Sequence, residues 1–443
     1  MSKRLNLLEE DVRKIFFHYL LPSIGGMVGL SLYIFFDTMF VGQGVGSEGL
    51  AALSIAIPMY NVYNAIGLLL GVGGATVLSI YHGEKNYDKA NEAFTISLII
   101  AVILGVVLTL IQGMFIDELC YFLGATEKLF PLVKEYLEIM AKFTWAFILS
   151  GTMVAMVRND KNPKLAMWAM LSGCISNIFL DWLFIIGFNM GMTGAIVATV
   201  MSPIITLLIL SVHFFKKMNT IKLVKIKSDF SLSIRIIRNG MASFILEVSG
   251  AIVIFAFNKA VFSLIGDIGL SAYSIIANIN LICAAIFTGV AQAIQPIISI
   301  NFGGKKTDRI NKSIKYAIIT SIVLGISFYI IGLIIPKPIV LIFNRDNIEL
   351  MKITVNGIRL YFIAFLFMGV NISLVSYFQS IEKAKISIFS SLSRGIIFIL
   401  IGLFLLPKVF SINGVWLTAT FAEVITLIIN LAYVFINRKH LIN

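Results

Sequence analysis

Charged residues are scarce in this chain of 443 residues: Asp, Glu, Lys and Arg together make up 13% of it, against about 25% in a typical soluble domain. Hydrophobic residues make up 58%, and the mean hydropathy is +0.94. That balance excludes a soluble globular protein. The composition therefore predicts a polytopic membrane protein.

Cysteine and histidine are also rare, with three and four residues respectively. The cysteines fall in or near apolar segments and the histidines are dispersed, so neither a disulfide framework nor a metal cluster is indicated. The chain has no HExxH, GxSxG or P-loop pattern. We therefore expect no cofactor and no enzymatic activity.

No removable signal peptide is predicted at the N-terminus. The sequence MSKRLNLLEEDVRKIFF is charged and amphipathic, and it lacks a short apolar core followed by small residues at a cleavage site. The first apolar segment is therefore expected to remain in the mature protein.

Apolar stretches of about 20 or more residues, the length that crosses about 30 Å of hydrocarbon as a helix, recur twelve times. We therefore predict an all-α polytopic membrane protein with twelve transmembrane helices. The predicted spans lie near 15–41, 50–81, 93–116, 132–157, 164–187, 192–215, 236–264, 269–300, 313–335, 353–378, 386–406 and 412–436.

The positive charge follows the loops between these spans. The net charge is +12, and most Lys and Arg residues fall in alternate loops, on the side that also holds both termini. Because Lys and Arg gather on the cytoplasmic side of membrane proteins, both termini are predicted to be cytoplasmic, in a cell (plasma or inner) membrane. The charge is thus a topology signal, and no nucleic-acid partner is implied.

The longest and most basic of these loops divides the spans into two groups of six. We predict an N-lobe over 1–215, a cytoplasmic linker over 216–233 and a C-lobe over 234–443. A shift of 220 positions matches SIYHGEKNYDKAN, which begins at Ser79, with SINFGGKKTDRIN, which begins at Ser299; coincidence is the alternative. Because each half has an even number of spans, the copies are predicted to be parallel, related by a pseudo-two-fold axis along the membrane normal, with a central cleft.

Two acidic residues interrupt the apolar segments of the first half. Asp181 lies deep in the fifth segment, and Asn177 precedes it by one helical turn, so the two side chains share a face. Asp37 lies at a matching depth in the first segment. An acid inside hydrocarbon costs about 2.5–3.5 kcal/mol on insertion scales and normally faces the protein interior, where it can bind a cation or titrate. The alternative is that each acid only hydrogen-bonds to a neighbouring helix.

Thr199 in the sixth segment reaches a comparable depth, and its hydroxyl would complete a set of oxygen ligands for Na⁺ with the two aspartates and the amide. A proton needs fewer ligands than Na⁺. Two carboxyl groups close together in a low dielectric disfavour double ionisation, and one of them then carries H⁺. Tyr33, one turn before Asp37, is placed to hydrogen-bond to it. Pro22 predicts a bend in the first helix. The coupling ion, H⁺ or Na⁺, is left open.

The acids of the second half, Glu247 and Glu423, do not match Asp37 or Asp181 under the repeat, so the cation site is assigned to the first half. Each of the two is open to a functional or an architectural role. Glu247 could meet Asn258 or a substrate in a central cavity, where Met and aromatic side chains would give a compliant wall. Further candidates for that cavity, with packing as the alternative at each, are Gln295, Met27, Met59 and Phe287.

These segments resemble the multidrug and toxic compound extrusion (MATE) family over nearly the whole chain. In the first half the similarity is carried by LPSIGG through YIFFDTMFVGQ, by RNDKNPKLAM leading to SNIFLDWLFI, and by TGAIVATVMS. In the second half it is carried by MASFILEVSG with Phe257 and Asn258, AIQPIISINFGGKKTDRI and NGVWLTATFAE. The tenth segment has no acid where the NorM branch has one, so the chain looks more like the branch of MepA and the DNA-damage-inducible protein F.

The resemblance implies an outward-directed antiporter that exchanges Na⁺ or H⁺ for amphipathic, often cationic compounds through a cleft between the lobes. The family's cation site falls on Asp37, Asn177, Asp181 and Thr199, and its bending first helix falls on Pro22. We expect a monomer surrounded by membrane lipid.

Three other functions are kept as alternatives: a flippase for a lipid-linked precursor, an intramembrane enzyme and a channel. A flippase would need cationic residues inside the spans to hold a pyrophosphate. The residues of that kind are Lys142, Lys259, Arg359 and Arg394. That small number makes the antiporter the favoured interpretation.

Overall fold

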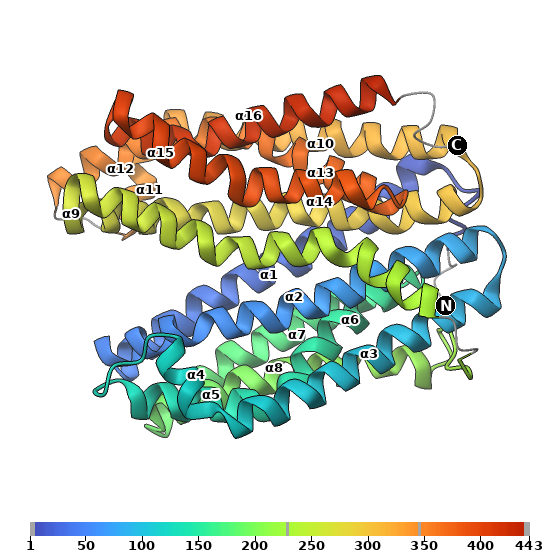
Figure 1. The fold of residues 1–443 in the computed structure, drawn as a ribbon, viewed down its shortest axis with the longest axis horizontal. Helices are drawn as coiled ribbons and strands as arrows, with labels where there is room; N and C mark the ends of the chain where they lie inside the picture. The colour runs from blue at the N-terminus through green and yellow to red at the C-terminus, as the bar shows by residue number, and fades with distance from the viewer. Residues whose placement is uncertain (1–4, 227–229, 344–346, 438–443) are drawn as a thin grey trace. The chain divides into compact units, whose positions relative to one another are not determined.

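The structure is a computed structural model that describes residues 5–226, 230–343 and 347–437, and every regular element in these ranges is a helix (Figure 1). Asn side chains cap several of these helices, and Asn86, Asn162 and Asn347 each accept a hydrogen bond from a backbone N–H of the first turn. The helices are α1 (Val12–Gly44), α2 (Ser47–Gly83), α3 (Tyr87–Met114), α4 (Ile116–Phe122), α5 (Phe130–Lys142), α6 (Thr144–Asn159), α7 (Pro163–Asp181), the π-helix η1 (Trp182–Gly187), α8 (Gly191–Phe215), α9 (Phe230–Gly303), α10 (Thr307–Ile334), α11 (Pro336–Phe343), α12 (Ile348–Tyr361), the 3₁₀ turn η2 (Phe362–Ala364), α13 (Phe365–Ser380), α14 (Ala384–Leu392), the π-helix η3 (Ser393–Ile397), α15 (Phe398–Phe410) and α16 (Ile412–Ile436).

The predicted all-helical membrane fold is confirmed. In the described part of the chain, ten helices are long and apolar enough to cross a membrane, and an eleventh span is formed by α5 and α6, which meet at 54°. The 74 residues of α9 exceed one crossing, and its backbone leaves the helical region at Gly266, where φ is 61°. Each of the twelve predicted segments is therefore helical over almost all of its length, and some of them, such as 132–157 and 353–378, cover two or more consecutive helices. The short helices α4 and α11 were not predicted.

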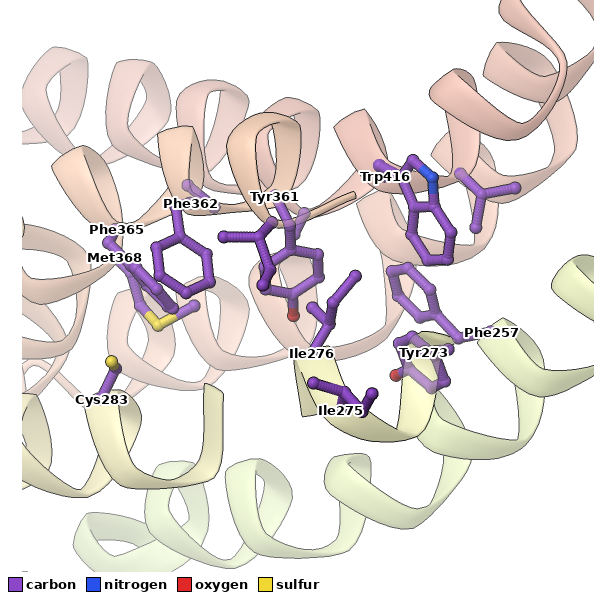
Figure 2. Packing of buried hydrophobic residues seen from close by; sticks show 14 of the residues in the cluster. Phe257, Tyr273, Ile275, Ile276, Cys283, Tyr361, Phe362, Phe365, Met368 and Trp416 are labelled. Carbon is purple, nitrogen blue, oxygen red and sulfur yellow. The ribbon is translucent and has the colours of Figure 1, made fainter. Parts of the chain in front are cut away.

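The break at Gly266 turns α9 back on itself. Phe257 and Tyr273 lie 16 positions apart on either side of it, which in a straight helix would separate them by about 24 Å. Their rings instead stack with centroids 4.9 Å apart and planes 1° apart (Figure 2). The two predicted spans 236–264 and 269–300 therefore form a helical hairpin.

The residues group into two compact units, Met1–Leu8 with Leu21–Phe244, and Glu9–Leu20 with Ile245–Asn443. We call them the first and the second unit. The change of unit falls inside α9, and the first turns of α1 group with the second unit. The lobe and linker boundaries predicted from the sequence, at 215 and 233, stay a prediction.

The internal repeat is visible in the element bounds. Helix α3 begins at 87 and ends at 114, and α10 begins at 307 and ends at 334, a shift of 220 at both ends. Helices α8 and α16 are related by a shift of 221. In the matched loops, Lys85 and Lys305 both have positive φ, 61° and 53°. The two loops therefore share a backbone shape that few non-glycine residues adopt, and coincidence no longer explains the match.

The core of the second unit is aromatic. Figure 2 shows rings from several helices packed together, among them Phe257, Tyr361, Phe365 and Trp416. Trp416 is fully buried. Interlocking aromatic rings of this kind give the unit a large buried apolar area independent of any polar site.

Two glycines allow close backbone contact within the first unit. An ideal Cβ at Gly240 of α9 would lie 1.8 Å from the backbone oxygen of Leu69 in α2, and one at Gly73 of α2 would lie 2.1 Å from that of Ile236. No side chain fits between backbones at such distances. The two helices touch here because both positions are glycine.

We expect Gly240→Ala to destabilise the protein, because the added methyl must push two backbones apart, at a cost of about 1–3 kcal/mol. Gly250→Ala is the matched control on the same helix, since no atom lies within 4 Å of its Cβ position and alanine favours helix over glycine. Thermal unfolding of the purified variants in detergent measures both. If Gly240→Ala unfolds at no lower temperature than Gly250→Ala, the close contact does not contribute as described.

Candidate cation site

Three helices of the first unit bring the predicted cation ligands together. Asp37 lies on α1, Asn177 and Asp181 on α7, and Thr199 on α8, and all four are buried. The carboxyl groups of Asp37 and Asp181 lie within hydrogen-bonding distance of each other. Helix α7 packs closely against α8, which is why residues separated by 18 positions or more in sequence share one buried cluster.

Helix α7 changes its winding at the acid. Its N-terminus is fixed by Asn162, which caps it, and by Pro163 in the first turn. The α-helical part ends at Asp181, and a π-helical turn, η1, follows over Trp182–Gly187. Such turns are rare and are frequently found at functional sites. The carboxylate therefore projects from a position where the backbone is locally rewound.

The cluster holds buried polar atoms that no described residue satisfies. Asp37 Oδ1, both carboxylate oxygens of Asp181 and both amide atoms of Asn177 have no hydrogen-bond donor or acceptor among the described residues. Leaving such a group unpaired costs about 1–3 kcal/mol, and more when it is charged. A proton shared between the carboxyls, or a cation among their oxygens, would remove much of that cost. The donor set therefore fits H⁺ or Na⁺.

Thr199 and Tyr136 complete the polar wall of the cluster. The hydroxyl of Thr199 donates to the carbonyl oxygen of Ala195, 3.0 Å away, so its oxygen lone pairs stay available. Tyr136 on α5 reaches hydrogen-bonding distance of Thr199 and lies close to both aspartates. Sequence reasoning missed Tyr136. It lies in a stretch rich in Lys and Glu, and only its spacing of one helical turn from each of the apolar positions Val133 and Met140 marks it as inward-facing.

Tyr33 lies close to Asp37, but its hydroxyl donates to the hydroxyl of Tyr60 on α2 and not to the carboxylate, as the sequence suggested. Spacing along one helix places Tyr33 near Asp37, but it does not show what a neighbouring helix offers. Here the hydroxyl of Tyr33 meets Tyr60 on α2. Tyr33 therefore flanks the cluster. Pro22 is buried inside α1, next to the residues where the helix passes from the second unit to the first.

The candidates for a substrate cavity differ in their exposure. Met27 and Met59 in the first unit are half-buried, as are Glu247 and Asn258 in the second. Gln295 is buried. Phe287 is fully buried, and its ring packs edge-on against Phe328 at 5.5 Å. Phe287 is therefore a core residue of the second unit, because it is fully buried within the hydrophobic core of that unit.

The other acid of the second half is paired. Glu423 on α16 accepts from Arg394 Nη2 at 2.6 Å and from Asn371 Nδ2 at 2.7 Å, and both partners of the ion pair are nearly buried. Arg394 sits on the π-helix η3. Of the two roles left open for Glu423, the architectural one therefore fits its surroundings, because the side chain is already neutralised.

A multi-carboxylate or His and Cys metal site is not found among the residues that the structure describes. The cluster around Asp37 and Asp181 has only two acids, so an ion bound there would depend on the neutral oxygens of Asn177 and Thr199. That composition suits a monovalent ion.

The MatE family model matches residues 22–183 and 241–405 of this chain. The chain is 24% identical over 441 residues to the multidrug export protein MepA of Staphylococcus saprophyticus, covering 98% of this chain and 96% of that protein. It is 26% identical to the MepA of Staphylococcus haemolyticus, covering 98% and 95%.

The fold is also that of a solved structure described as the outward-facing conformation of a multidrug resistance MATE family transporter of the MOP superfamily. The TM-score is 0.93 at 21% identity, covering 100% of this chain and 99% of that one. The matched segments of the family model run from residue 22 inside α1 to the end of α7 and the first residues of η1, and they cover most of α9 to α15. On this match, which spans well over half of its length, the chain belongs to the MATE family.

Proposed function

We propose that this protein is a secondary active multidrug efflux antiporter, which exports amphipathic, often cationic compounds in exchange for H⁺ or Na⁺. The proposal rests on one observation above all, the buried aspartate pair with its unsatisfied oxygens in a family of transporters. Its relatives named MepA are multidrug export proteins. It acts as a monomer in the plasma or inner membrane, with both termini on the cytoplasmic side.

The coupling would follow from charge. When the pair is empty, two carboxylates in a low dielectric repel each other, and a proton or Na⁺ between them removes that repulsion. Binding therefore favours whichever conformation brings Asp37 and Asp181 together. An ion can drive the cycle only by binding the two conformations with different affinity, and the distance between the carboxyl groups supplies that difference.

Helix α1 would transmit the change. It carries Asp37 and, nearer its start, Pro22, which lacks a backbone N–H and so weakens the helix at that turn. A shift of Asp37 toward Asp181 can then alter the bend at Pro22 without breaking further hydrogen bonds. In this proposal the two units alternate access to a cleft predicted between the lobes.

A flippase for a lipid-linked precursor is the second candidate. Fewer cationic side chains are available to bind a pyrophosphate than the four that the sequence places inside the spans. Arg394 is bound to Glu423 at 2.6 Å, and Lys142 to Glu138 at 2.9 Å. Only Lys259 and Arg359, of the four cations inside spans, carry no ion pair among the described residues. Two exposed cations make a poor site for a pyrophosphate, which favours the antiporter.

Transport in sealed vesicles tests the proposal. With the protein inserted and ethidium as the probe, a Na⁺ gradient and a pH gradient are imposed separately. We expect ethidium movement driven by one gradient, abolished by an ionophore for that ion, and absent in empty vesicles. Movement that needs neither gradient would indicate a channel and would contradict the proposal.

A further inference from the structure

A cavity lies at the lysine-rich end of the first unit. It has a volume of about 440 Å³, within the range of about 300–1,000 Å³ of small-molecule sites. Its walls come from α3, α6, α8 and the segment after α8. The lining side chains used below are Phe94, Leu98, Met153, Phe214, Ile221 and Lys222.

The wall made by the segment after α8 is fixed in place. The backbone N–H of Lys222 donates to Asn91 Oδ1 at 2.8 Å, and that of Val224 donates to Thr95 Oγ1 at 3.1 Å. Both acceptors lie in the first turns of α3. Ile221, which directly precedes the first of these attachments, is fully buried. The segment therefore closes the cavity as a built wall of the unit.

A second attachment holds the same segment from the other side. The backbone N–H and the hydroxyl of Thr220 both donate to Asp160, and His213 Nε2 lies 2.8 Å from the same carboxylate. The other ring nitrogen of His213 faces the amide nitrogen of Asn162, whose oxygen caps α7. His213 therefore has a partner that the sequence did not reveal, because Asp160 is 53 positions away.

The cavity combines apolar lining side chains with one lysine. Aromatic and aliphatic side chains make the interior, and the rings of Phe94 and Phe214 stack 6.0 Å apart. Lys222 is the one charged residue of the lining, and because the lining surface is apolar it contributes its aliphatic stem, while the residue itself is exposed. Next to it, Leu223 and Phe215 expose large apolar side chains, at 70% and 82%. Alternating Lys and exposed apolar residues are typical of a segment that lies in the headgroup region of a membrane.

We propose that this cavity binds an acyl chain of an anionic phospholipid, whose phosphate pairs with the ammonium group of Lys222. The apolar walls match the chain, and the single charge matches the headgroup. A neutral amphiphile would leave Lys222 unpaired, and a free phosphate would leave the apolar interior unfilled. The proposal rests on membrane residence alone and does not depend on which ion or compound is transported.

Native mass spectrometry of the full-length protein tests it, after reconstitution with phosphatidylglycerol or phosphatidylcholine of the same chain length. Wild type should retain one phosphatidylglycerol in preference to phosphatidylcholine. Lys222→Gln should lower that preference about five-fold, the effect of one basic group near an anionic headgroup. The control is Lys225→Gln, an exposed lysine of the same segment outside the cavity lining, which should keep the preference.

Filling the cavity provides the second arm. Leu98→Trp, on the α3 wall, should abolish retention of both lipids. If the Leu98→Trp protein does not fold, the Lys222→Gln variant still tests the proposal, because Lys222 is exposed. Three results would overturn the proposal: equal retention of the two lipids by wild type, equal effects of the Lys222 and Lys225 variants, or displacement of the lipid by ethidium at the same site.

Discussion

We expect Asp37→Asn and Asp181→Asn each to reduce efflux of ethidium to the level of cells that lack the protein. The amide has nearly the shape of the carboxylate, so packing in the cluster is kept. It carries no charge and cannot exchange a proton, and the repulsion between Asp37 and Asp181 disappears. The variant then binds the coupling ion no better in one conformation than in the other, and the gradient cannot drive the cycle.

Fluorescence of ethidium in cells that express each variant measures the effect, with the membrane level of the protein quantified in parallel. Asp117→Asn is the matched control, because it makes the same chemical change to a half-exposed acid that pairs with Lys134 at the surface, where an ion pair contributes about 0–1 kcal/mol. It should export normally. Normal export by either cluster variant would remove the aspartates from the mechanism.

We expect Arg394→Met to lower the free energy of unfolding by about 3–5 kcal/mol, because it leaves Glu423 buried without its counter-charge. The double variant Arg394→Met, Glu423→Met recovers most of that loss, since the buried charge is then removed with its partner. Asn371, which also donates to Glu423, stays in place in both variants.

Chemical unfolding of the purified variants in detergent measures this pair of effects, and a double-mutant cycle isolates the interaction between the two side chains. The structural role assigned to the pair predicts a large positive coupling and ethidium export by the double variant. Equal stabilities of the single and double variants would show that the ion pair contributes little. Loss of export by a stable double variant would return Glu423 to the functional residues.

Apolar length predicted the fold well. Each of the twelve segments is helical over almost all of its length, because a membrane-spanning helix needs about 20 apolar residues whatever its neighbours are. The short helices α4 and α11 escaped detection, since seven or eight residues carry too little pattern. Their starts, at 116 and 336, keep the shift of 220, so the repeat was the signal that could have found them.

The residues of the buried cluster could be predicted from the sequence where their burial in a membrane helix is energetically unfavourable. Asp37 and Asp181 stood out because charge inside hydrocarbon is unfavourable, and the helical spacing added Asn177. Tyr136 could not be singled out, because a tyrosine in a membrane helix can also pack in the core or lie at the membrane interface. The partner of Tyr33 could not be predicted either, since helix spacing describes one helix and Tyr60 lies on another.

Charged pairs between residues far apart in the chain could not be predicted from the sequence. Asp160 with His213, and Arg394 with Glu423, join residues 53 and 29 positions apart, and no local pattern connects them. Glu423 looked equally suited to function and to packing until its counter-ion was seen. In both pairs the charged residues are evident from the sequence, but only the packing of the helices determines which charges meet.

In the proposed mechanism the buried pair Asp37 and Asp181 holds the exchangeable ion, and infrared difference spectroscopy observes those carboxyl groups directly. Addition of ethidium or Na⁺ to the purified protein in lipid should change the carbonyl stretch of a protonated carboxyl in wild type and in Asp117→Asn. The same signal should be absent in Asp37→Asn and Asp181→Asn. An identical signal in Asp181→Asn, or none in wild type, would contradict the account.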